Sequence, residues 1–481
     1  MKLLKIEPVS RLEGDARILI LLDEEGKVQE AYFQVLEFKG FESFIKGRPA
    51  EEIPRIVTRI CGVCPWAHHM AAGKAIDSLF GREPTETAKK IREMAYCAHI
   101  LDSHTLHFYF LAGPDFLLSP DTKKSERNII GIFKRNPEVV KGIVKRRKMI
   151  TKIESIVGGK SIHPACVIPG GVSKKISENE QREIEEMAKD LIKFSESWLH
   201  KFENEILKKY EDVFFGDTYY LETYYGGLVD KDNKLNFYDG NVRIVSQKGK
   251  EVIKFRSSEY TKHIAEKVEP WTFTKFPYLK DIGWKGFVDG VDSGIYRVGP
   301  LGRLNACDGI TTEKANEAYK RFYEVSGKPA HHSMLAHWAR LIEMLYASER
   351  ILELSNDEDI TSENIVNLEG DFTGIGVGTV EAPRGLLIHH YQANQNAIIT
   401  GGNIIIPTTM NNPAINIEIK KSASKLINGN KISDALLNRI EMAFRAYDPC
   451  LSCSVHSFDS GLPLKIEIYD SSRNLVKVVR R

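Results

Sequence analysis

Two short cysteine pairs are the residues of this chain with the clearest capacity for chemistry. The first is Cys61-Gly-Val-Cys64, and the second, Cys450-Leu-Ser-Cys453, is followed by His456. Thiolates are soft ligands for nickel, iron, zinc or copper(I), and each pair can hold one metal with both sulfurs. Structural zinc sites usually take their pairs from one small local unit. Because these pairs lie near opposite ends of a 481-residue chain, the whole fold must bring them together, which favours a central chemical site.

Two other uses of these cysteines have to be weighed. One is a structural zinc ion held by all four sulfurs, and the other is a redox-active dithiol. A dithiol would explain one pair and leave the other without a role. The remaining cysteines, Cys97, Cys166 and Cys307, belong to no motif and are most simply buried small hydrophobic residues.

The composition gives no sign of a nucleic-acid or membrane partner. The 67 Lys and Arg residues nearly balance the 65 Asp and Glu residues, and the net charge is +2. No apolar run approaches the roughly 18 residues that a membrane span needs, and residues 1–8 lack the apolar core of a signal peptide. An odd count of 7 cysteines argues against a disulfide framework, so we expect a cytoplasmic protein.

Helical periodicity dominates the elements that must position the cysteines, and β patterns are confined to smaller parts. Strands are predicted at 3–7, 16–22 and 28–35, and a β-hairpin at 242–255. We therefore expect a mainly α fold with β appendages, a bundle of long helices. The expected divisions are a β unit (1–48), a helical bundle with the first cysteine pair (49–213), a β-rich insertion (214–300), the return of the bundle with the second pair (301–456) and a C-terminal extension (457–481).

Start and stop signals delimit the helices. Pro65 begins one helix, which places Cys64 at a helix N-terminus, where exposed N–H groups favour a thiolate. A second helix is expected to stop at Gly113-Pro114. The predicted helices span residues 66–80, 85–113, 177–210, 312–325, 331–354 and 433–447.

Two glycine- and proline-marked segments are read as irregular. The run Gly374-x-Gly-x-Gly378 lacks the spacing of a dinucleotide-binding motif and is predicted to be a tight loop. Ile404-Ile-Ile-Pro407 is predicted to be a short buried strand that meets a turn.

In their wider context, Arg59–His68 and Asp448–His456, the cysteine motifs resemble the two signatures of the large subunit of nickel–iron hydrogenases. Further blocks of that family occur in the expected order: Pro8–Gly14, Phe38–Glu42, His104–Tyr109, Gly158–Pro164, Glu381–Gly385 and Pro407–Thr409. The resemblance covers residues 8–456. It implies the long-helix bundle of that family and a catalytic role.

The resemblance also implies the metal ligands. Cys61 and Cys450 would be terminal nickel ligands. Cys64 and Cys453 would bridge nickel to an iron that carries CO and cyanide.

Residues around the metals take their roles from the same resemblance. Glu13, otherwise a turn carboxylate, would relay protons beside a terminal cysteine. Arg384, otherwise a surface salt-bridge residue, would donate to a cyanide or sit above the open side of the metals. Thr408 would serve a second cyanide. His68 would donate a hydrogen bond to a bridging sulfur.

Three further positions complete this shell. Asp448 opens the second cysteine motif. Ser103 stands where many membrane-linked relatives carry an aspartate near the arginine. Glu42, the backbone carbonyl of Ile404 and His456 match the ligands of a magnesium (or second iron) site, because oxygen ligands suit a hard cation.

The implied reaction is the reversible heterolytic oxidation of dihydrogen. The chain lacks further cysteines in cluster spacing, so its electrons would pass to an iron–sulfur small subunit. The sequence most resembles the cytoplasmic branch of methanogenesis whose enzymes do not reduce deazaflavin and feed heterodisulfide and ferredoxin reduction. Further partners would be heterodisulfide reductase and a 2Fe-2S subunit. The alternative is a non-catalytic scaffold like the quinone-site subunit of NADH dehydrogenase, which lacks the cysteine pairs.

The C-terminal segment has two interpretations. Residues 464–469 and 475–479 have strand patterns, which a permanent hairpin would explain. Large subunits of the family are made with a tail that a protease removes after nickel insertion. We therefore expect the mature chain to end at His456.

Overall fold

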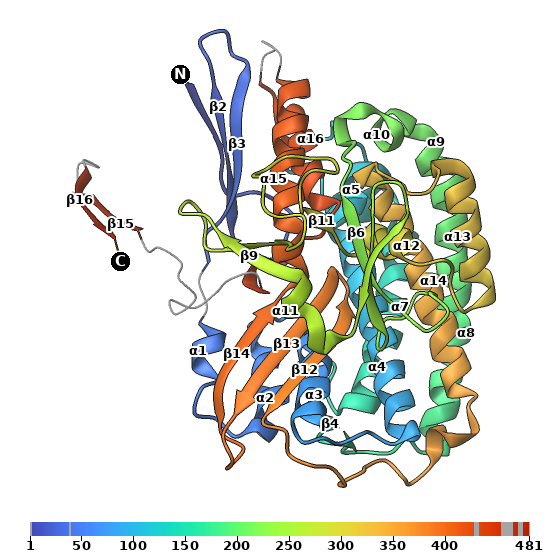
Figure 1. The fold of residues 1–481 in the computed structure, drawn as a ribbon. Coiled ribbons are helices and arrows are strands. Elements are labelled where there is room, and N and C mark those ends of the chain that lie inside the picture. The colour runs from blue at the N-terminus through green and yellow to red at the C-terminus, as the bar shows by residue number, and fades with distance from the viewer. Residues whose placement is uncertain (1, 38–39, 428–431, 454–464, 470–474, 481) are drawn as a thin grey trace.

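The computed structural model describes residues 2–37, 40–427, 432–453, 465–469 and 475–480 of the chain. Long helices run side by side through the molecule, and small sheets lie against them (Figure 1). The predicted class, mainly α with β appendages, is confirmed. The longer helices are α3 (Pro65–Leu79), α4 (Glu86–Leu106), α7 (Pro137–Gly158), α8 (Glu178–Lys201), α13 (Glu313–Ser326), α14 (Ala336–Ser355), α15 (Pro407–Leu426) and α16 (Asp434–Arg445).

Shorter elements connect and cover these helices. The short helices are α1 (Phe41–Phe44), α2 (Ile53–Ile56), α5 (Gly113–Leu117), α6 (Ile129–Arg135), α9 (Leu207–Lys209), α10 (Glu211–Phe215), α11 (Tyr260–His263) and α12 (Pro300–Ala306). The strands are β1 (Lys2–Ile6), β2 (Ala16–Leu22), β3 (Val28–Val35), β4 (Val167–Ile168), β5 (Gly171–Val172), β6 (Tyr224–Val229), β7 (Asn241–Val245), β8 (Glu251–Phe255), β9 (Ile264–Val268), β10 (Lys275–Leu279), β11 (Tyr296–Arg297), β12 (Ile375–Ala382), β13 (Gly385–Ala393), β14 (Ile399–Ile405), β15 (Lys465–Tyr469) and β16 (Leu475–Arg480).

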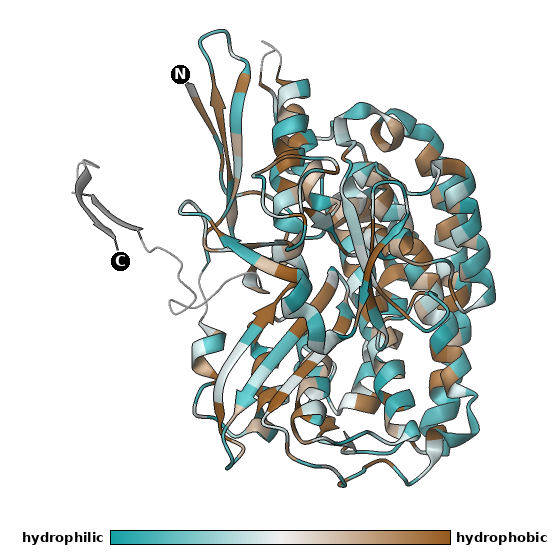
Figure 2. Ribbon diagram, viewed as in Figure 1, coloured by the Kyte–Doolittle hydropathy of each residue, from teal (hydrophilic) through white to brown (hydrophobic). Residues whose placement is uncertain are grey.

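Helix α14 forms the centre of the bundle. It is buried along nearly its whole length and packs against α4 and α8. Helix α8 buries only one face, so hydrophilic and hydrophobic residues alternate along it (Figure 2). Its predicted capping box is present: the Ser177 hydroxyl accepts the N–H of Glu180, whose carboxylate accepts the N–H of Ser177.

The sheet β12-β13-β14 packs directly on α3, and two glycines of β12 permit the close approach. A Cβ at Gly376 would come within 1.9 Å of the Ala75 carbonyl oxygen, and one at Gly378 within 2.2 Å of the Ala71 carbonyl oxygen. The prediction of a tight loop at 374–378 is therefore wrong, because these glycines serve helix–strand packing in a regular strand.

The two predicted β units are present. Strands β1, β2 and β3 form an antiparallel sheet, and their bounds differ from the predicted ones by at most one residue. Strand β3 packs against α15, and the rings of Phe33 and Phe444 stack 5.4 Å apart. The predicted hairpin, β7 and β8, belongs to a sheet of order β11-β6-β7-β8.

Two helix boundaries differ from the prediction. The chain does not stop at Gly113-Pro114: a π-helical turn over His107–Ala112 continues α4 into α5. Proline is tolerated in the first turn of α5 because no intrahelical partner awaits its missing N–H there. Pro407 does the same at the start of α15, so the strand β14 leads into a long helix rather than a turn.

The predicted C-terminal strands pair as the antiparallel hairpin β15–β16, which lies apart from the body of the molecule (Figure 1). Among the described residues, no helix combines the length and the apolar character that crossing a membrane requires.

Candidate metal centre

The four motif cysteines lie together in the interior. All are buried, and their sulfur atoms lie within 4.8 Å of one another. The Sγ–Sγ distances are 3.2 Å for Cys61–Cys450, 3.3 Å for Cys64–Cys453 and 3.1 Å for Cys450–Cys453. The two pairs from opposite ends of the chain therefore meet, and four such sulfurs together suit soft metal ions.

Local backbone geometry presents the sulfurs toward one another. Cys61 ends a 3-10 turn, and its Sγ accepts the N–H groups of Val63 and Cys64 at 3.2 Å and 3.4 Å. Cys64 is the N-cap residue of α3, so the helix dipole favours its thiolate. On the other side, Asp448 has a φ of 55°, a left-handed conformation that turns the chain out of α16 toward Cys450.

The thiols share their protons unequally. Hydrogen bonds from Cys450, Cys453 and Cys64 hold the pKa of Cys61 well below its ordinary value. Burial raises the pKa of Cys450 and Cys453 well above the ordinary value. Thiolate ligands must lose their protons to bind metal, so a cation with more than one positive charge is the natural counterpart of this cluster.

Glu13 lies against the second cysteine pair. Residues Glu13 and Cys450 form an isolated parallel β-bridge, and the N–H of Leu451 donates to the Glu13 carbonyl at 3.0 Å. The Glu13 Oε2 accepts from Cys450 Sγ at 3.1 Å and from the N–H of Ser452 at 3.0 Å. Gly14 allows this approach, since it has a φ of 88° and a Cβ there would lie 2.8 Å from that of Leu451.

A buried polar network holds the loop that carries Glu13. Arg11 donates to Asp115 at 2.6 Å and to Asn438 at 2.7 Å. The hydroxyl of Ser10 donates to Glu441 on α16 at 2.5 Å. Burial lowers the pKa of Arg11 to about 10. The loop is thus tied to the helix that ends at the second cysteine pair.

Arg384 lies in the turn between β12 and β13 and is fixed by Asp448. Its Nε donates to the Asp448 carbonyl at 2.6 Å and its Nη2 to Asp448 Oδ1 at 3.2 Å. Burial works against the charge, but Asp448 and the thiolates of the cluster raise the pKa of Arg384 well above its ordinary value. Its buried Nη1 has no hydrogen-bond partner among the described residues.

A small cavity lies between Arg384 and the sulfurs. Its lining includes Arg384, Thr408, Cys64, Cys450 and Cys453. The Thr408 hydroxyl oxygen accepts the N–H of Cys450 at 3.0 Å. The cavity therefore adjoins one guanidinium N–H and one hydroxyl, which are donors for small ligands with a terminal acceptor atom.

His68 begins a hydrogen-bonded chain that the sequence analysis predicted only in its first member. The His68 Nε2 lies 3.4 Å from Cys453 Sγ, and its Nδ1 lies 3.1 Å from His389 Nε2. His389 in turn contacts the Tyr391 hydroxyl. Alternation of His389 and Tyr391 on one face of a strand was the available signal, and it was hidden by the uniformly buried strand around them.

Ser103 lies on α4 and is buried, and its Oγ has no hydrogen-bond partner, Arg384 included, among the residues that the structure describes. His107, one turn further along, donates from Nε2 to the Arg445 carbonyl at 2.9 Å and lies 3.9 Å from Asp448 Oδ1. Burial lowers the pKa of His107 well below its ordinary value, so the ring is neutral.

The residues predicted for a hard cation meet in part. The Glu42 carboxylate accepts the N–H of Ile404 at 3.1 Å, which brings it beside the backbone of β14. The third predicted ligand, His456, lies outside the described residues.

A fully buried ion network, which the sequence analysis missed, supports the loop of Arg384. Arg303 donates to both oxygens of Glu343, at 2.6 Å and 2.7 Å, and to Glu381 at 2.7 Å. It also donates to the Ala382 carbonyl at 2.8 Å. His104 lies 2.7 Å from Glu343. Glu381 was quoted only as part of a motif, and single charges in apolar helices gave no indication of their pairing.

Comparisons with known proteins agree with this geometry. The sequence matches the family described as nickel-dependent hydrogenase over residues 39–128 and 229–456, and the family described as HoxL-like over residues 3–38. It is 45% identical to an iron-sulfur subunit of the F420-non-reducing hydrogenase of Archaeoglobus profundus, with 100% of each chain covered. It is 35% identical to the beta subunit of the NAD-reducing hydrogenase HoxS of Cupriavidus necator, with 98% of each covered.

Solved structures share the architecture. The crystal structure of an NAD+-reducing NiFe hydrogenase in the H2-reduced state superimposes with a TM-score of 0.90 at 37% identity and covers 95% of this chain and 100% of that one. The Ni-Fe-Se hydrogenase of D. vulgaris Hildenborough in the reduced state has the same fold, with a TM-score of 0.74 at 22% identity, over 95% of this chain and 100% of its own.

Proposed function

The chain belongs to the nickel-dependent hydrogenase family, and we propose that within it this protein is the catalytic subunit from which electrons of dihydrogen pass to an iron–sulfur small subunit. The observation that carries the proposal is the buried cluster of four sulfurs within 4.8 Å, drawn from both ends of the chain, with a carboxylate 3.1 Å from one of them. Structural zinc would not need that carboxylate.

The sulfurs fit a nickel–iron group. Cys61 and Cys450 would hold nickel alone, and Cys64 and Cys453, 3.3 Å apart, would be shared with iron. When bound, this group would supply the heterolytic cleavage of dihydrogen and the one-electron steps. The unpartnered N–H of Arg384 and the hydroxyl of Thr408 suit the terminal atoms of cyanide ligands on the iron, and the apolar remainder of the cavity suits CO.

Glu13 would be the first proton acceptor. Its Oε2 lies within hydrogen-bonding distance of Cys450 Sγ, so a proton on that sulfur can pass directly to the carboxylate. The second hydrogen bond, from the N–H of Ser452, keeps the carboxylate in place in both protonation states. His68 would orient the bridging sulfur of Cys453 from the opposite direction. Ser103 and Asp448 would complete the surroundings of Arg384.

Glu42, the carbonyl of Ile404 and His456 would hold magnesium (or a second iron). The carboxylate already lies beside the backbone of β14, which supports this assignment.

The relatives suggest the electron acceptor. The Archaeoglobus relative and a subunit of the F420-non-reducing hydrogenase of Methanothermobacter thermautotrophicus, 41% identical over 98% of this chain and 99% of the relative, carry names that exclude deazaflavin. We infer the same for this chain, with heterodisulfide and ferredoxin reduction in the cytoplasm through heterodisulfide reductase and a 2Fe-2S subunit. Removal of the segment after His456 would follow nickel insertion.

The test is anaerobic purification of the complex that contains this chain. We expect nickel and iron in the metal analysis, infrared bands in the CO and cyanide region, and dihydrogen-dependent reduction of a viologen dye. The co-purifying subunits would identify the electron acceptor. Zinc without nickel, and no dye reduction, would favour the structural-zinc alternative.

A further inference from the structure

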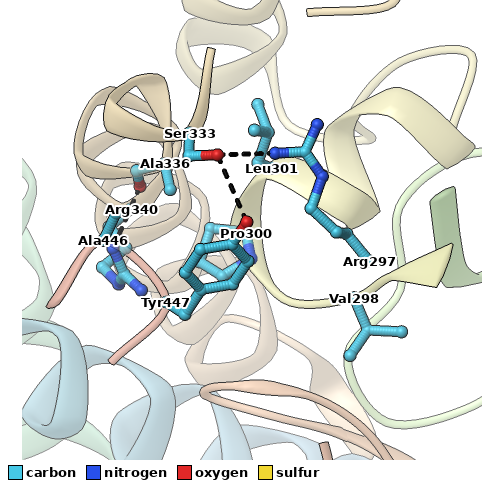
Figure 3. Close-up of a pocket in the computed structure, with 9 residues that line it drawn as sticks. All are labelled: Arg297, Val298, Pro300, Leu301, Ser333, Ala336, Arg340, Ala446 and Tyr447. Atoms are coloured by element: carbon cyan, nitrogen blue, oxygen red, sulfur yellow. Dashed lines mark hydrogen bonds between the residues drawn. The ribbon is translucent and has the colours of Figure 1, made fainter. Parts of the chain in front are cut away.

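A second small cavity lies close to the candidate metal centre (Figure 3). Its polar lining consists of Arg297, Ser333, Arg340 and Tyr447, and each of these residues is less than 9% exposed. Tyr447 directly precedes Asp448, the residue that fixes Arg384. The cavity is enclosed and about as large as a single water molecule requires.

Arg340 provides unsatisfied donors to this cavity. It is fully buried on α14, and its Nη1 has only long contacts, 3.4 Å to the Ala336 carbonyl and 3.5 Å to His337 Nδ1. Its Nε and Nη2 have no hydrogen-bond partner among the described residues. A buried guanidinium without partners is costly, so water that accepts from it and donates onward is the natural occupant.

A directed hydrogen-bond chain leaves the cavity. Arg297 Nη1 donates to Ser333 Oγ at 2.7 Å, and Ser333 Oγ lies 3.3 Å from the Tyr447 hydroxyl (Figure 3). The Tyr447 hydroxyl donates to Glu418 Oε2 at 2.5 Å. Because the single proton of Tyr447 points to Glu418, the Ser333 hydroxyl must donate to Tyr447. Every donor in the chain therefore points toward the Glu418 carboxylate.

Glu418 is built as a proton acceptor rather than as a permanent anion. It is fully buried on α15, and its Oε1 has no hydrogen-bond partner among the residues described. Burial raises its pKa to about 7, although Arg297, Tyr447, Ser333 and Lys421 favour the charged form. The charged and titratable groups that face it are Arg297, Tyr447, Tyr225, Tyr219 and Lys421.

The chain has an outlet to solvent. Lys421 lies one turn beyond Glu418 on α15 and lines a surface groove together with Asp289, to which it donates at 2.8 Å. The Lys421 side chain is 33% exposed. A proton held by Glu418 is thus one helical turn from groups in contact with bulk water.

We propose that Glu418 is the acceptor of a secondary proton route, in which water in the Arg340 cavity passes protons through Ser333 and Tyr447. The inference rests on the hydrogenase function proposed above. In each transfer the water protonates Ser333 Oγ, the Ser333 proton moves to the Tyr447 oxygen, and the Tyr447 proton moves to Glu418 Oε2. One O–H bond forms and one breaks at each hydroxyl, so both are regenerated. The protons come from oxidised dihydrogen.

The route is tested in the purified complex where the main route is blocked by Glu13→Gln. We expect this variant to keep a small residual dihydrogen-oxidation rate that rises with pH through about 7, as Glu418 loses its proton. Adding Tyr447→Phe should lower the residual rate at least about fivefold and remove the pH dependence, because it deletes one relay oxygen. Adding Tyr346→Phe is the matched control: it deletes an equally buried hydroxyl, bonded to the Leu235 carbonyl, away from the chain.

The outcomes separate clearly. An equal residual rate in both double variants at equal nickel content would overturn the proposal, and so would a Glu13→Gln variant with no residual rate at all. Glu418→Gln should reproduce the loss of the pH dependence, while Glu418→Asp should keep part of it. The wild-type complex in the same series reports on the hydrogenase function itself: without nickel or dye reduction there, the proposed function fails before the proton route is at issue.

Discussion

Replacing Glu13 by Gln should remove the proton acceptor of the metal centre and leave its frame intact. Both hydrogen bonds of the carboxylate involve Oε2, which faces Cys450 Sγ and the N–H of Ser452. The amide oxygen of Gln can still accept from Ser452, so stability should change by less than about 1 kcal/mol. An amide cannot take up a proton at neutral pH. We therefore expect turnover to fall at least about 100-fold, which is about 2.7 kcal/mol in the activation barrier.

The assay compares three measurements on the same purified complex: nickel and iron content, dye reduction under dihydrogen, and exchange of dihydrogen with D2O. Glu37→Gln is the matched control, since Glu37 accepts from the Ser452 hydroxyl at 3.3 Å on the same turn and should keep turnover within about threefold of wild type. Wild-type exchange in Glu13→Gln at full nickel content would refute the reasoning. Loss of nickel in Glu13→Gln would show that the carboxylate is structural.

Cys450→Ser should abolish nickel retention and dihydrogen uptake while the protein stays soluble, as metal analysis would show; an active variant would exclude the ligand assignment. Intact-mass analysis of active enzyme should give a chain that ends at His456, and a full-length mass at full activity would contradict processing. Gly378→Ala should lower the melting temperature by the equivalent of about 1–3 kcal/mol, because the new Cβ meets backbone atoms 2.2 Å away; Gly142→Ala, in an exposed helix with its nearest neighbour at 3.9 Å, should not. Burial lowers the pKa of His69 to about 4 from 6.5, so the unfolded chain takes up that proton first and stability should fall as pH drops from about 6.5 to about 4; a melting temperature constant over that range would contradict the burial argument.

Local signals were sufficient where the physical cause is local. The capping box at Ser177 and Pro65 at a first turn each specify a helix start through their own local geometry. The alternation of buried residues in β2 likewise reports one apolar face. Helix α15 was missed because Pro413 and two neighbouring asparagines look like breakers, whereas tertiary packing buries them inside the helix. The glycines at 376 and 378 carried a packing signal that is visible only once α3 lies on them.

The candidate site divides in the same way. The cysteine pairs were evident from spacing, but the positions of Glu13 and Arg384 beside them came from the family resemblance. No periodicity relates Glu13 to Cys450, which are 437 positions apart. The pairing of Arg303 with Glu343 could not be predicted either, because charge complementarity in a buried network depends on three-dimensional proximity rather than on sequence pattern.

The separation of the cysteines along the chain also fixes the timing of assembly. Cys61 and Cys450 are 389 positions apart, so a ribosome must complete nearly the whole polypeptide before these sulfurs first meet. N-terminal regions fold first during synthesis, and at that stage only the thiols of Cys61 and Cys64 are available from the cluster. Two thiols hold a metal far less firmly than four. Nickel delivery must therefore be the closing event of biogenesis, and a translation product that stops short of Cys450 is a chain that can be discarded without loss of metal.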